Sequence, residues 1–252
     1  MNNYYADTQL RLDRLLTTLA LGSRKEVQQI IRSGRISINQ MSVRDPSLHV
    51  KAGDAVCLDS KLIDARIMRH IMLHKPCGIL TAARDAKQPT VLDLLPDVYR
   101  SCGCMPVGRL DKDTSGFLIL TTDGELAHRL LSPKREIWKC YEAEVDGPLT
   151  DRDVGAFCEG LQLSDFVALR ARLEIISSSS DAACARVWVC EGKFHQVRRM
   201  FAACGRTVIK LKRLSIGPLK LDESLQPGEY RELSNEELSL LLKAVQIEKE
   251  PS

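Results

Sequence analysis

Short apolar runs of strand length, mixed with helical stretches in no regular alternation, constrain the fold of this chain most. The runs typical of strands are 71–73, 117–121, 141–145 and 185–189, and those typical of helices are 125–131 and 195–203. A doubly wound sheet would place a helix between successive strands, so this pattern predicts an α+β fold instead. At 252 residues the chain is long enough for one large domain or for a large domain with a small one.

The front of the chain has a pattern of its own. Its apolar residues recur at i, i+3, i+4 and i+7, at Leu12, Leu15, Leu16 and Leu19. Gly22 ends this predicted helix, and Ser23 and Glu26 then have the spacing of a capping box, which predicts a second helix that stops at Gly34. Alternating apolar and polar residues with turn signals follow. We therefore expect two helices and a strand ribbon over residues 9–60.

Residues 61–70 carry charge without a clean period, and we expect them to be a linker to a second domain at 71–245. The net charge of +3 decides little about partners, because 36 basic residues nearly balance 33 acidic ones. Between residues 192 and 221, however, eight basic residues occur without any acidic one, which favours a nucleic-acid surface over a solvated face.

In the front segment, polar residues that lie mostly off the apolar stripe form a second candidate RNA surface. These residues are Arg11, Arg14, Ser23, Arg24, Lys25 and Arg35. Charge alone favours an ordinary solvated face here. The order of the predicted elements, two helices followed by a strand ribbon, favours RNA binding.

The nine cysteines are scattered without Cys-x-x-Cys pairs, which argues against a disulfide framework and against a four-ligand zinc site. We expect reduced thiols and no metal, with Cys102 and Cys104 as the weaker metal-binding alternative. Residues 1–5 lack the features of a signal peptide, and no apolar run approaches the roughly 18 residues of a membrane span. These features predict a soluble, cytoplasmic protein without membrane contact.

The densest polar constellation runs from Gly108 to Gly116, as Gly-Arg-Leu-Asp-Lys-Asp-Thr-Ser-Gly, directly before an apolar strand. Glycines at both ends let such a loop approach a ligand closely. Asp111 and Asp113 could serve aspartyl phosphotransfer, but Ser115 stands where that chemistry places Thr, and the apolar run follows the motif instead of preceding it. A simple acidic turn is the other alternative. Nucleotide-binding and hydrolase motifs are absent from the sequence.

This loop resembles the catalytic motif of the bacterial ribosomal RNA pseudouridine synthases of the RsuA type. Three further motifs of that family occur in the family order: Lys75-Pro-x-Gly78 before the loop, and Lys139-Cys-Tyr141 and Glu191-Gly-Lys-Phe-His-Gln-Val-Arg-Arg-Met-Phe201 after it. The front segment resembles the small RNA-binding module shared by a ribosomal small-subunit protein and several RNA-modifying enzymes. His74 replaces the usual Asn, and Gln40 replaces the usual Gly. The resemblance spans roughly 9–240 and implies a mixed, mainly antiparallel sheet with flanking helices.

The resemblance also implies roles for individual residues. Asp111 is the carboxylate that acts at the ribose, and Tyr141 is the phenol that accepts and returns the proton at carbon five of uracil. Arg198 lies opposite Asp111 and keeps it ionised, while Arg109 helps to hold the extruded nucleotide. Further substrate contacts are expected from Lys75, Lys193, His195 and Arg199. The reaction consumes nothing and implies neither a metal nor a cofactor.

The implied activity is isomerisation of one uridine in ribosomal RNA after base flipping. Covalent attack by Asp111 and a glycal-type intermediate are both compatible with the residues. Two stretches, 195–205 and the later 227–231, resemble the small-subunit enzymes more than the large-subunit ones. We therefore expect small-subunit ribosomal RNA, free or in an assembly intermediate, as the partner of a monomeric enzyme. Modification of large-subunit RNA is the nearest alternative. A non-catalytic RNA-binding or ribosome-assembly factor is the alternative from another class.

Overall fold

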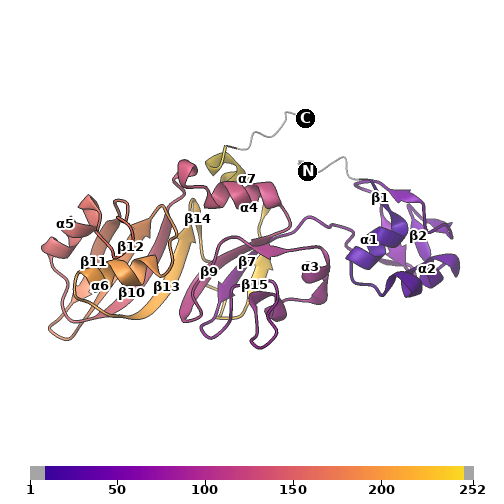
Figure 1. The fold of residues 1–252 in the computed structure, drawn as a ribbon. Coiled ribbons are helices and arrows are strands. Elements are labelled where there is room, and N and C mark those ends of the chain that lie inside the picture. The colour runs from indigo at the N-terminus through magenta and orange to yellow at the C-terminus, as the bar shows by residue number, and fades with distance from the viewer. Residues whose placement is uncertain (1–8, 247–252) are drawn as a thin grey trace. The chain divides into compact units, whose positions relative to one another are not determined.

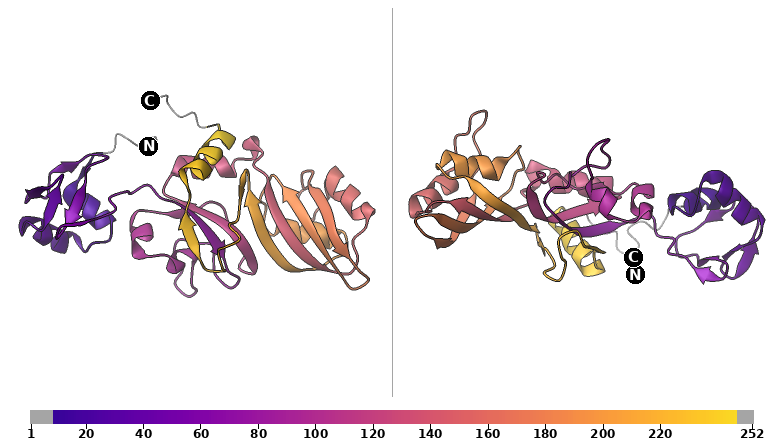
Figure 2. Two further views of the ribbon diagram at one scale, coloured as in Figure 1. Left: turned by 180° about the vertical axis from the view of Figure 1, so that it is seen from behind. Right: turned by 90° about the horizontal axis from the view of Figure 1, so that it is seen from below.

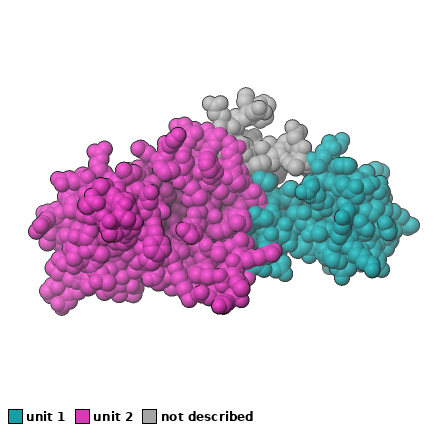
Figure 3. Space-filling view, viewed as in Figure 1, with its two compact units in different colours: residues 1–69, 95–104, 249–252 teal, residues 70–94, 105–248 magenta. Residues whose placement is uncertain are grey.

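The computed structural model describes residues 9–246, which divide into two units (Figures 1 and 3). The first unit comprises 9–69 together with 95–104, and the second comprises 70–94 together with 105–246. Segment 95–104, which we expected in the second domain, joins the first unit because its apolar side chains pack on the core of that unit. Residues 1–5, which lack the features of a signal peptide, lie outside the described residues, as do residues 247–252.

Three helices belong to the first unit, α1 (Leu12–Thr18), α2 (Arg24–Arg32) and α3 (Asp97–Ser101). The leucine stripe of α1 is buried, as its spacing predicted. Ser23 caps α2 in the predicted capping box, because its hydroxyl accepts from the Glu26 amide while the Glu26 carboxylate accepts from the Ser23 amide.

The strands of the first unit are short: β1 (Leu10–Arg11), β2 (Ile36–Ile38), β3 (Met41–Val43), β4 (His49–Val50), β5 (Val56–Leu58) and β6 (Lys61–Leu62). They form a ribbon in the order β3-β2-β5-β6 and a separate β1-β4 pair. Asn39 and Gln40 turn the β2-β3 hairpin with φ of +50° and +69°, so Gln40 adopts the left-handed conformation that glycine would favour. Strand β6 takes the first two residues of the expected linker, which leaves 63–69 without helix or strand.

The second unit is built on one large sheet. Its strands are β7 (His70–Lys75), β8 (Met105–Pro106), β9 (Thr114–Thr121), β10 (Lys139–Asp146), β11 (Arg172–Ser178), β12 (Ala182–Val189), β13 (Val208–Ile216), β14 (Leu219–Lys220) and β15 (Tyr230–Glu232). The main order is β11-β12-β10-β13-β9-β7-β15, and every pairing except the parallel β13-β9 pair is antiparallel. The predicted α+β fold with a mixed, mainly antiparallel sheet is therefore confirmed.

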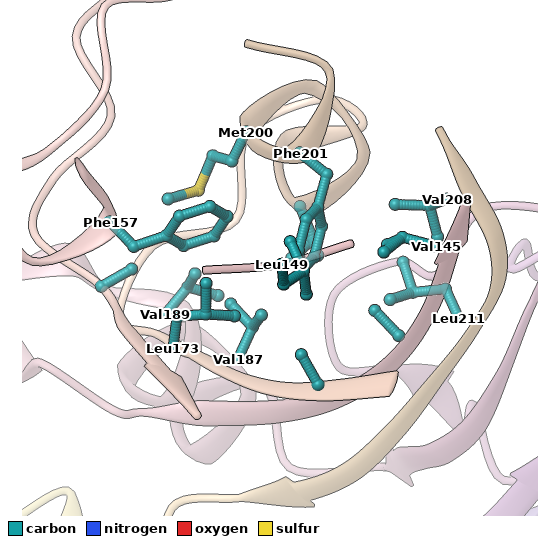
Figure 4. Packing of buried hydrophobic residues seen from close by; sticks show 14 of the residues in the cluster. Val145, Leu149, Phe157, Leu173, Val187, Val189, Met200, Phe201, Val208 and Leu211 are labelled. Carbon is teal, nitrogen blue, oxygen red and sulfur yellow. The ribbon is translucent and has the colours of Figure 1, made fainter. Parts of the chain in front are cut away.

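Four helices flank this sheet, α4 (Gly124–Leu131), α5 (Asp151–Glu159), α6 (Gln196–Ala203) and α7 (Asn235–Ala244), with short 3-10 turns at Val91–Leu94 and Pro133–Arg135. Figure 4 shows how α5 and α6 close a core against β10, β11, β12 and β13. Phe157 of α5 meets Phe201 of α6 with ring centroids 5.1 Å apart. Because this packing fixes α6 against the sheet, it also fixes the motif residues that α6 carries. Figure 2 shows the ribbon from two further sides.

Within residues 9–246 no helix is long and apolar enough to cross a membrane. In the same part of the chain, no group of three or more His, Cys, Asp or Glu side chains is placed to hold a metal ion, and none of the nine cysteines forms a disulfide.

Candidate active site

Three motif regions meet in one row across the large sheet. Tyr141 on β10 faces Arg213 on β13, Arg213 faces Gly116 on β9, and Gly116 faces Lys75 on β7. Side chains of facing residues lie on the same side of a sheet. Gly116 is required in this row because a Cβ atom there would lie 2.3 Å from the Arg213 carbonyl oxygen. The row therefore brings segments from four parts of the sequence to the base of the loop at 108–116.

Lys75 holds that loop from beneath. Its side chain is 0% exposed, and its ammonium group donates to the carbonyl oxygens of Thr114 at 2.9 Å, Pro76 at 3.0 Å and Asp111 at 3.1 Å. Burial lowers the pKa of Lys75. Because its donors are used on the backbone, Lys75 positions the loop, whereas the sequence had suggested a substrate contact.

The carboxylate of Asp111 lies on the open side of the same loop, 27% exposed. A backbone bond from the Thr114 amide to the Asp111 carbonyl tightens the turn, and the Thr81 hydroxyl binds the Leu110 carbonyl at 2.8 Å. The Asp111 carboxylate faces His195, whose Nε2 is 3.5 Å from Oδ1. The backbone of the loop is thus fixed, while its first carboxylate stays accessible to a ligand.

Arg198 is paired differently from the expectation. Its guanidinium contacts the Asp113 carboxylate at 3.0 Å and donates to the Val208 carbonyl at 2.9 Å. We had expected Arg198 opposite Asp111, but the left-handed turn at His195 (φ +49°) brings the imidazole to that position instead. Arg198 therefore braces the second carboxylate of the loop.

Tyr141 has a cationic neighbour that the motifs had not assigned to the site. Arg213 is 4% exposed, and it donates through Nε to the Phe117 carbonyl at 2.7 Å and through Nη1 to the Tyr141 hydroxyl at 3.3 Å. Lys139 is also buried, and its burial together with the nearby Arg213 lowers the pKa of Lys139 to about 8. The sequence signal for Arg213 was its period-two spacing from the buried Leu211.

Several buried donors at the site have no partner among the described residues. Thr114 Oγ1, Arg198 Nε and Arg213 Nη2 are all buried without a hydrogen bond. Buried polar groups are normally satisfied, so such atoms are candidates for contacts to a bound ligand. Arg109 is exposed and forms no ion pair or side-chain hydrogen bond to another residue within 9–246, which leaves it available to a ligand as well.

The other predicted substrate residues lie at the start of α6. Lys193 is exposed with its ammonium 5.7 Å from the Phe166 ring, and Arg199 lies over the same ring at 5.0 Å. Arg199 is also paired with the Asp165 carboxylate. We had expected Arg199 to contact the substrate; in the structure its guanidinium binds Ser164 and Asp165 and so links the 164–166 loop to α6.

Residues predicted to bind RNA in the front module differ in how far they are engaged. Arg11 binds the buried Asp13 at 3.0 Å, and Arg35 is paired with Asp59. Ser23 caps α2. The remaining three are exposed and make no side-chain hydrogen bond or ion pair to another described residue, namely Arg14, Arg24 and Lys25. These three are free to meet phosphate groups.

The site combines an accessible loop carboxylate, a buried lysine that holds the loop, and a phenol whose hydroxyl accepts from a buried arginine. Its sheet is mixed, and a separate small module precedes it in the chain. A family model described as RNA pseudouridylate synthase matches residues 69–203, and the S4 domain model matches residues 10–56. The chain belongs to the RNA pseudouridine synthases, in the S4-containing group of the RsuA type, and is an enzyme of that class.

Individual relatives are similar to this protein over nearly its whole length. A protein of Bacillus subtilis named uncharacterized RNA pseudouridine synthase YtzG is 41% identical over 92% of this chain and 98% of its own length. The ribosomal small subunit pseudouridine synthase A of Pseudomonas aeruginosa is 40% identical over 91% and 99% of the two chains. A crystal structure of a pseudouridylate synthase has a TM-score of 0.64 at 33% identity, covering 92% of this chain and 99% of its own.

Proposed function

We propose that this enzyme isomerises one specific uridine of small-subunit ribosomal RNA and that Asp111 is the essential carboxylate. The accessible Asp111 side chain on a loop anchored by buried Lys75 is the observation that carries the proposal. The relative from Pseudomonas aeruginosa, named for the small ribosomal subunit, supports the choice of substrate.

In the proposed reaction the bond between the ribose carbon and the uracil nitrogen breaks, the ring turns, and a bond to uracil carbon five forms. Asp111 either attacks the anomeric carbon or steers an intermediate in which the uracil is detached. The proton at carbon five moves to Tyr141, and a proton returns to the ring nitrogen, so nothing is consumed. General acid–base help of this kind contributes about 10² to 10⁴ in rate.

The neighbours of these two residues would support the chemistry. Arg213 donates to the Tyr141 hydroxyl at 3.3 Å, which holds the phenol oxygen in position. Arg198 holds the loop through Asp113. Exposed Arg109 would contact the extruded nucleotide, which offsets part of the few kcal/mol that flipping costs.

Recognition would be shared between the two parts of the chain. We propose that the module at 9–60 binds ribosomal RNA or an assembly intermediate through Arg14, Arg24 and Lys25, and that residues 71–245 carry out the chemistry. We also propose that the enzyme acts in the cytoplasm as a monomer. Mapping pseudouridines in the ribosomal RNA of cells that lack the protein distinguishes a small-subunit from a large-subunit target.

The test is Asp111→Asn, which keeps the shape of the side chain but removes its charge. We expect ribosomal RNA to bind as before while tritium release from RNA labelled at uridine carbon five stops. Asp181→Asn, at an exposed position away from the loop, is the matched control and should release tritium normally. Release by Asp111→Asn at the wild-type rate would refute the proposed role. Binding without release by the wild type would favour the non-catalytic factor.

A further inference from the structure

One aromatic side chain close to the site is exposed to an unusual degree. Phe194 is 70% exposed, compared with 42% for Trp138, the other aromatic among the large exposed apolar residues of the described chain. A single exposed apolar residue needs no explanation by itself. Phe194 differs from an ordinary exposed residue, because the structure fixes both the loop that carries it and the orientation of its ring.

The loop that carries Phe194 is held by buried polar groups. Glu191, 9% exposed, accepts hydrogen bonds from the Leu169 amide at 2.8 Å and from the side-chain amide of Gln196 at 2.7 Å. Gln196, 5% exposed, accepts from the Lys193 amide at 3.0 Å. These bonds fix the backbone on both sides of Phe194, so the ring is presented to solvent by a fixed loop.

The ring is also stacked. Its centroid lies 3.9 Å from that of the His195 imidazole, with 16° between the planes. His195 in turn faces Asp111, with 3.5 Å between Nε2 and Oδ1. His195 has a left-handed backbone (φ +49°), a conformation that is unfavourable for a non-glycine residue and that tends to occur at functional sites. Asp111, His195 and Phe194 therefore form a continuous series, and with one face of the phenyl ring on the imidazole its other face is left to solvent.

We propose that the outer face of Phe194 stacks on an RNA base adjacent to the uridine that lies at Asp111. This inference rests on the proposed function, because it assumes that a uridine is flipped at Asp111. When the uridine is flipped out, the adjacent base loses a stacking partner. The Phe194 ring, which is separated from the Asp111 carboxylate by the His195 imidazole, replaces that partner. Stacking between bases and aromatic side chains is a common mode of single-stranded RNA recognition. Exposed Lys193, next in the chain, supplies a cation for the nearby phosphate.

Three substitutions at Phe194 separate stacking from simple apolar contact. Stacking of one base is worth about 1–3 kcal/mol, so Phe194→Ala should lower kcat/KM for tritium release from a small-subunit ribosomal RNA transcript by about 5- to 150-fold. Phe194→Leu, apolar but without a ring, should lose most of the same factor, whereas Phe194→Tyr should stay near the wild type. The thermal midpoint should not change, because the ring is 70% exposed. Ile176→Ala, 47% exposed on β11, is the control and should be neutral.

A second measurement does not depend on activity. Aromatic side chains stacked on bases form covalent adducts under short-wavelength ultraviolet light, and cleavage after Lys193 and Arg198 releases Phe194 within the tryptic peptide 194–198. We expect this peptide from the Asp111→Asn protein irradiated with the same transcript to carry a nucleotide, and the adduct to vanish in Asp111→Asn combined with Phe194→Leu.

The outcomes separate this inference from the proposed function. If tritium release is normal, Phe194→Ala has wild-type kcat/KM and adducts form only on other peptides, the stacking inference is overturned while the proposed function stands. If the wild type releases no tritium but the 194–198 adduct forms, the proposed reaction fails while base stacking by Phe194 is supported. Equal activity of Phe194→Leu and the wild type would show that the ring itself is not needed, which also overturns the inference.

Discussion

Replacing Lys75 with methionine tests whether a buried cation positions the catalytic loop. The Lys75 ammonium donates to three carbonyl oxygens at 2.9–3.1 Å, and two of these, Asp111 and Thr114, belong to the loop. Methionine keeps the length of the apolar stem and removes the donors. The substitution should therefore loosen the loop without leaving a large cavity.

The size of the effect follows from two opposing contributions. A buried carbonyl group that loses its partner costs about 1–3 kcal/mol, so three of them cost about 3–9 kcal/mol. The buried ammonium carries a desolvation cost of several kcal/mol, which methionine removes. The direction of the pKa shift of Lys75, downward through burial, agrees with such a cost. We expect a net loss of about 2–4 kcal/mol in the free energy of unfolding.

Urea unfolding and tritium release, measured on the same protein, decide the question. We expect Lys75→Met to lose stability and to lower kcat by about 10²-fold, because a small misplacement of a reacting group has that effect. Lys112→Met is the control, since Lys112 is exposed and its ammonium binds Gln88. If Lys75→Met unfolds like the wild type and raises only KM, Lys75 contacts RNA and the positioning argument is wrong.

Two further predictions concern the neighbouring charges. Burial lowers the pKa of Lys139 to about 8 from 10.5. Between these two pKa values the unfolded chain holds a proton that the folded protein has released. The free energy of unfolding should therefore rise from pH 8 to about pH 10 by about 2 kcal/mol more in the wild type than in Lys139→Met. Urea unfolding curves that change with pH equally in the two proteins would contradict this prediction. In a double-mutant cycle with alanine, Arg198 and Asp113 should show a coupling free energy of unfolding of about 0.5–1 kcal/mol. The same cycle with Arg198 and Asp111 should show a smaller coupling. A larger coupling between Arg198 and Asp111 would support the pairing expected from the motif.

The sequence was most informative where structure depends on local signals. The leucine stripe of α1 and the Ser23–Glu26 capping box were predicted from spacings of three and four residues, because these contacts form within one helix. The α+β class followed from the lengths of the apolar runs. The segment 95–104 could not be placed, because its packing on the first unit depends on residues far away in the sequence.

At the site, the motifs indicated the 108–116 loop and several residues close to it. They did not indicate which side chains those residues contact. The position of Arg213 beside Tyr141 depends on the β10-β13 register, which the sequence alone does not specify. The contact of His195 with Asp111 depends on a left-handed backbone conformation that histidine rarely adopts. Lys75 was expected to contact substrate because it lies in a family motif, and the sequence could not show that four backbone carbonyl groups surround its buried ammonium.

The basic stretch at 192–221 shows why a count of charges overstates the cations available to RNA. Five of its eight basic side chains are engaged with protein groups in the structure, at Arg198, Arg199, Arg206, Lys210 and Arg213. The other three, at Lys193, Lys212 and Lys220, make no side-chain hydrogen bond or ion pair to another described residue. Lys210 pairs with Glu144 at an exposed position, where an ion pair is worth little and can be exchanged for a phosphate, whereas Arg213 is fixed by burial. The acid-free run therefore divides into two groups: Arg198 and Arg213 hold groups of the site, and we expect Lys193, Lys212 and Lys220 to be available to the RNA backbone.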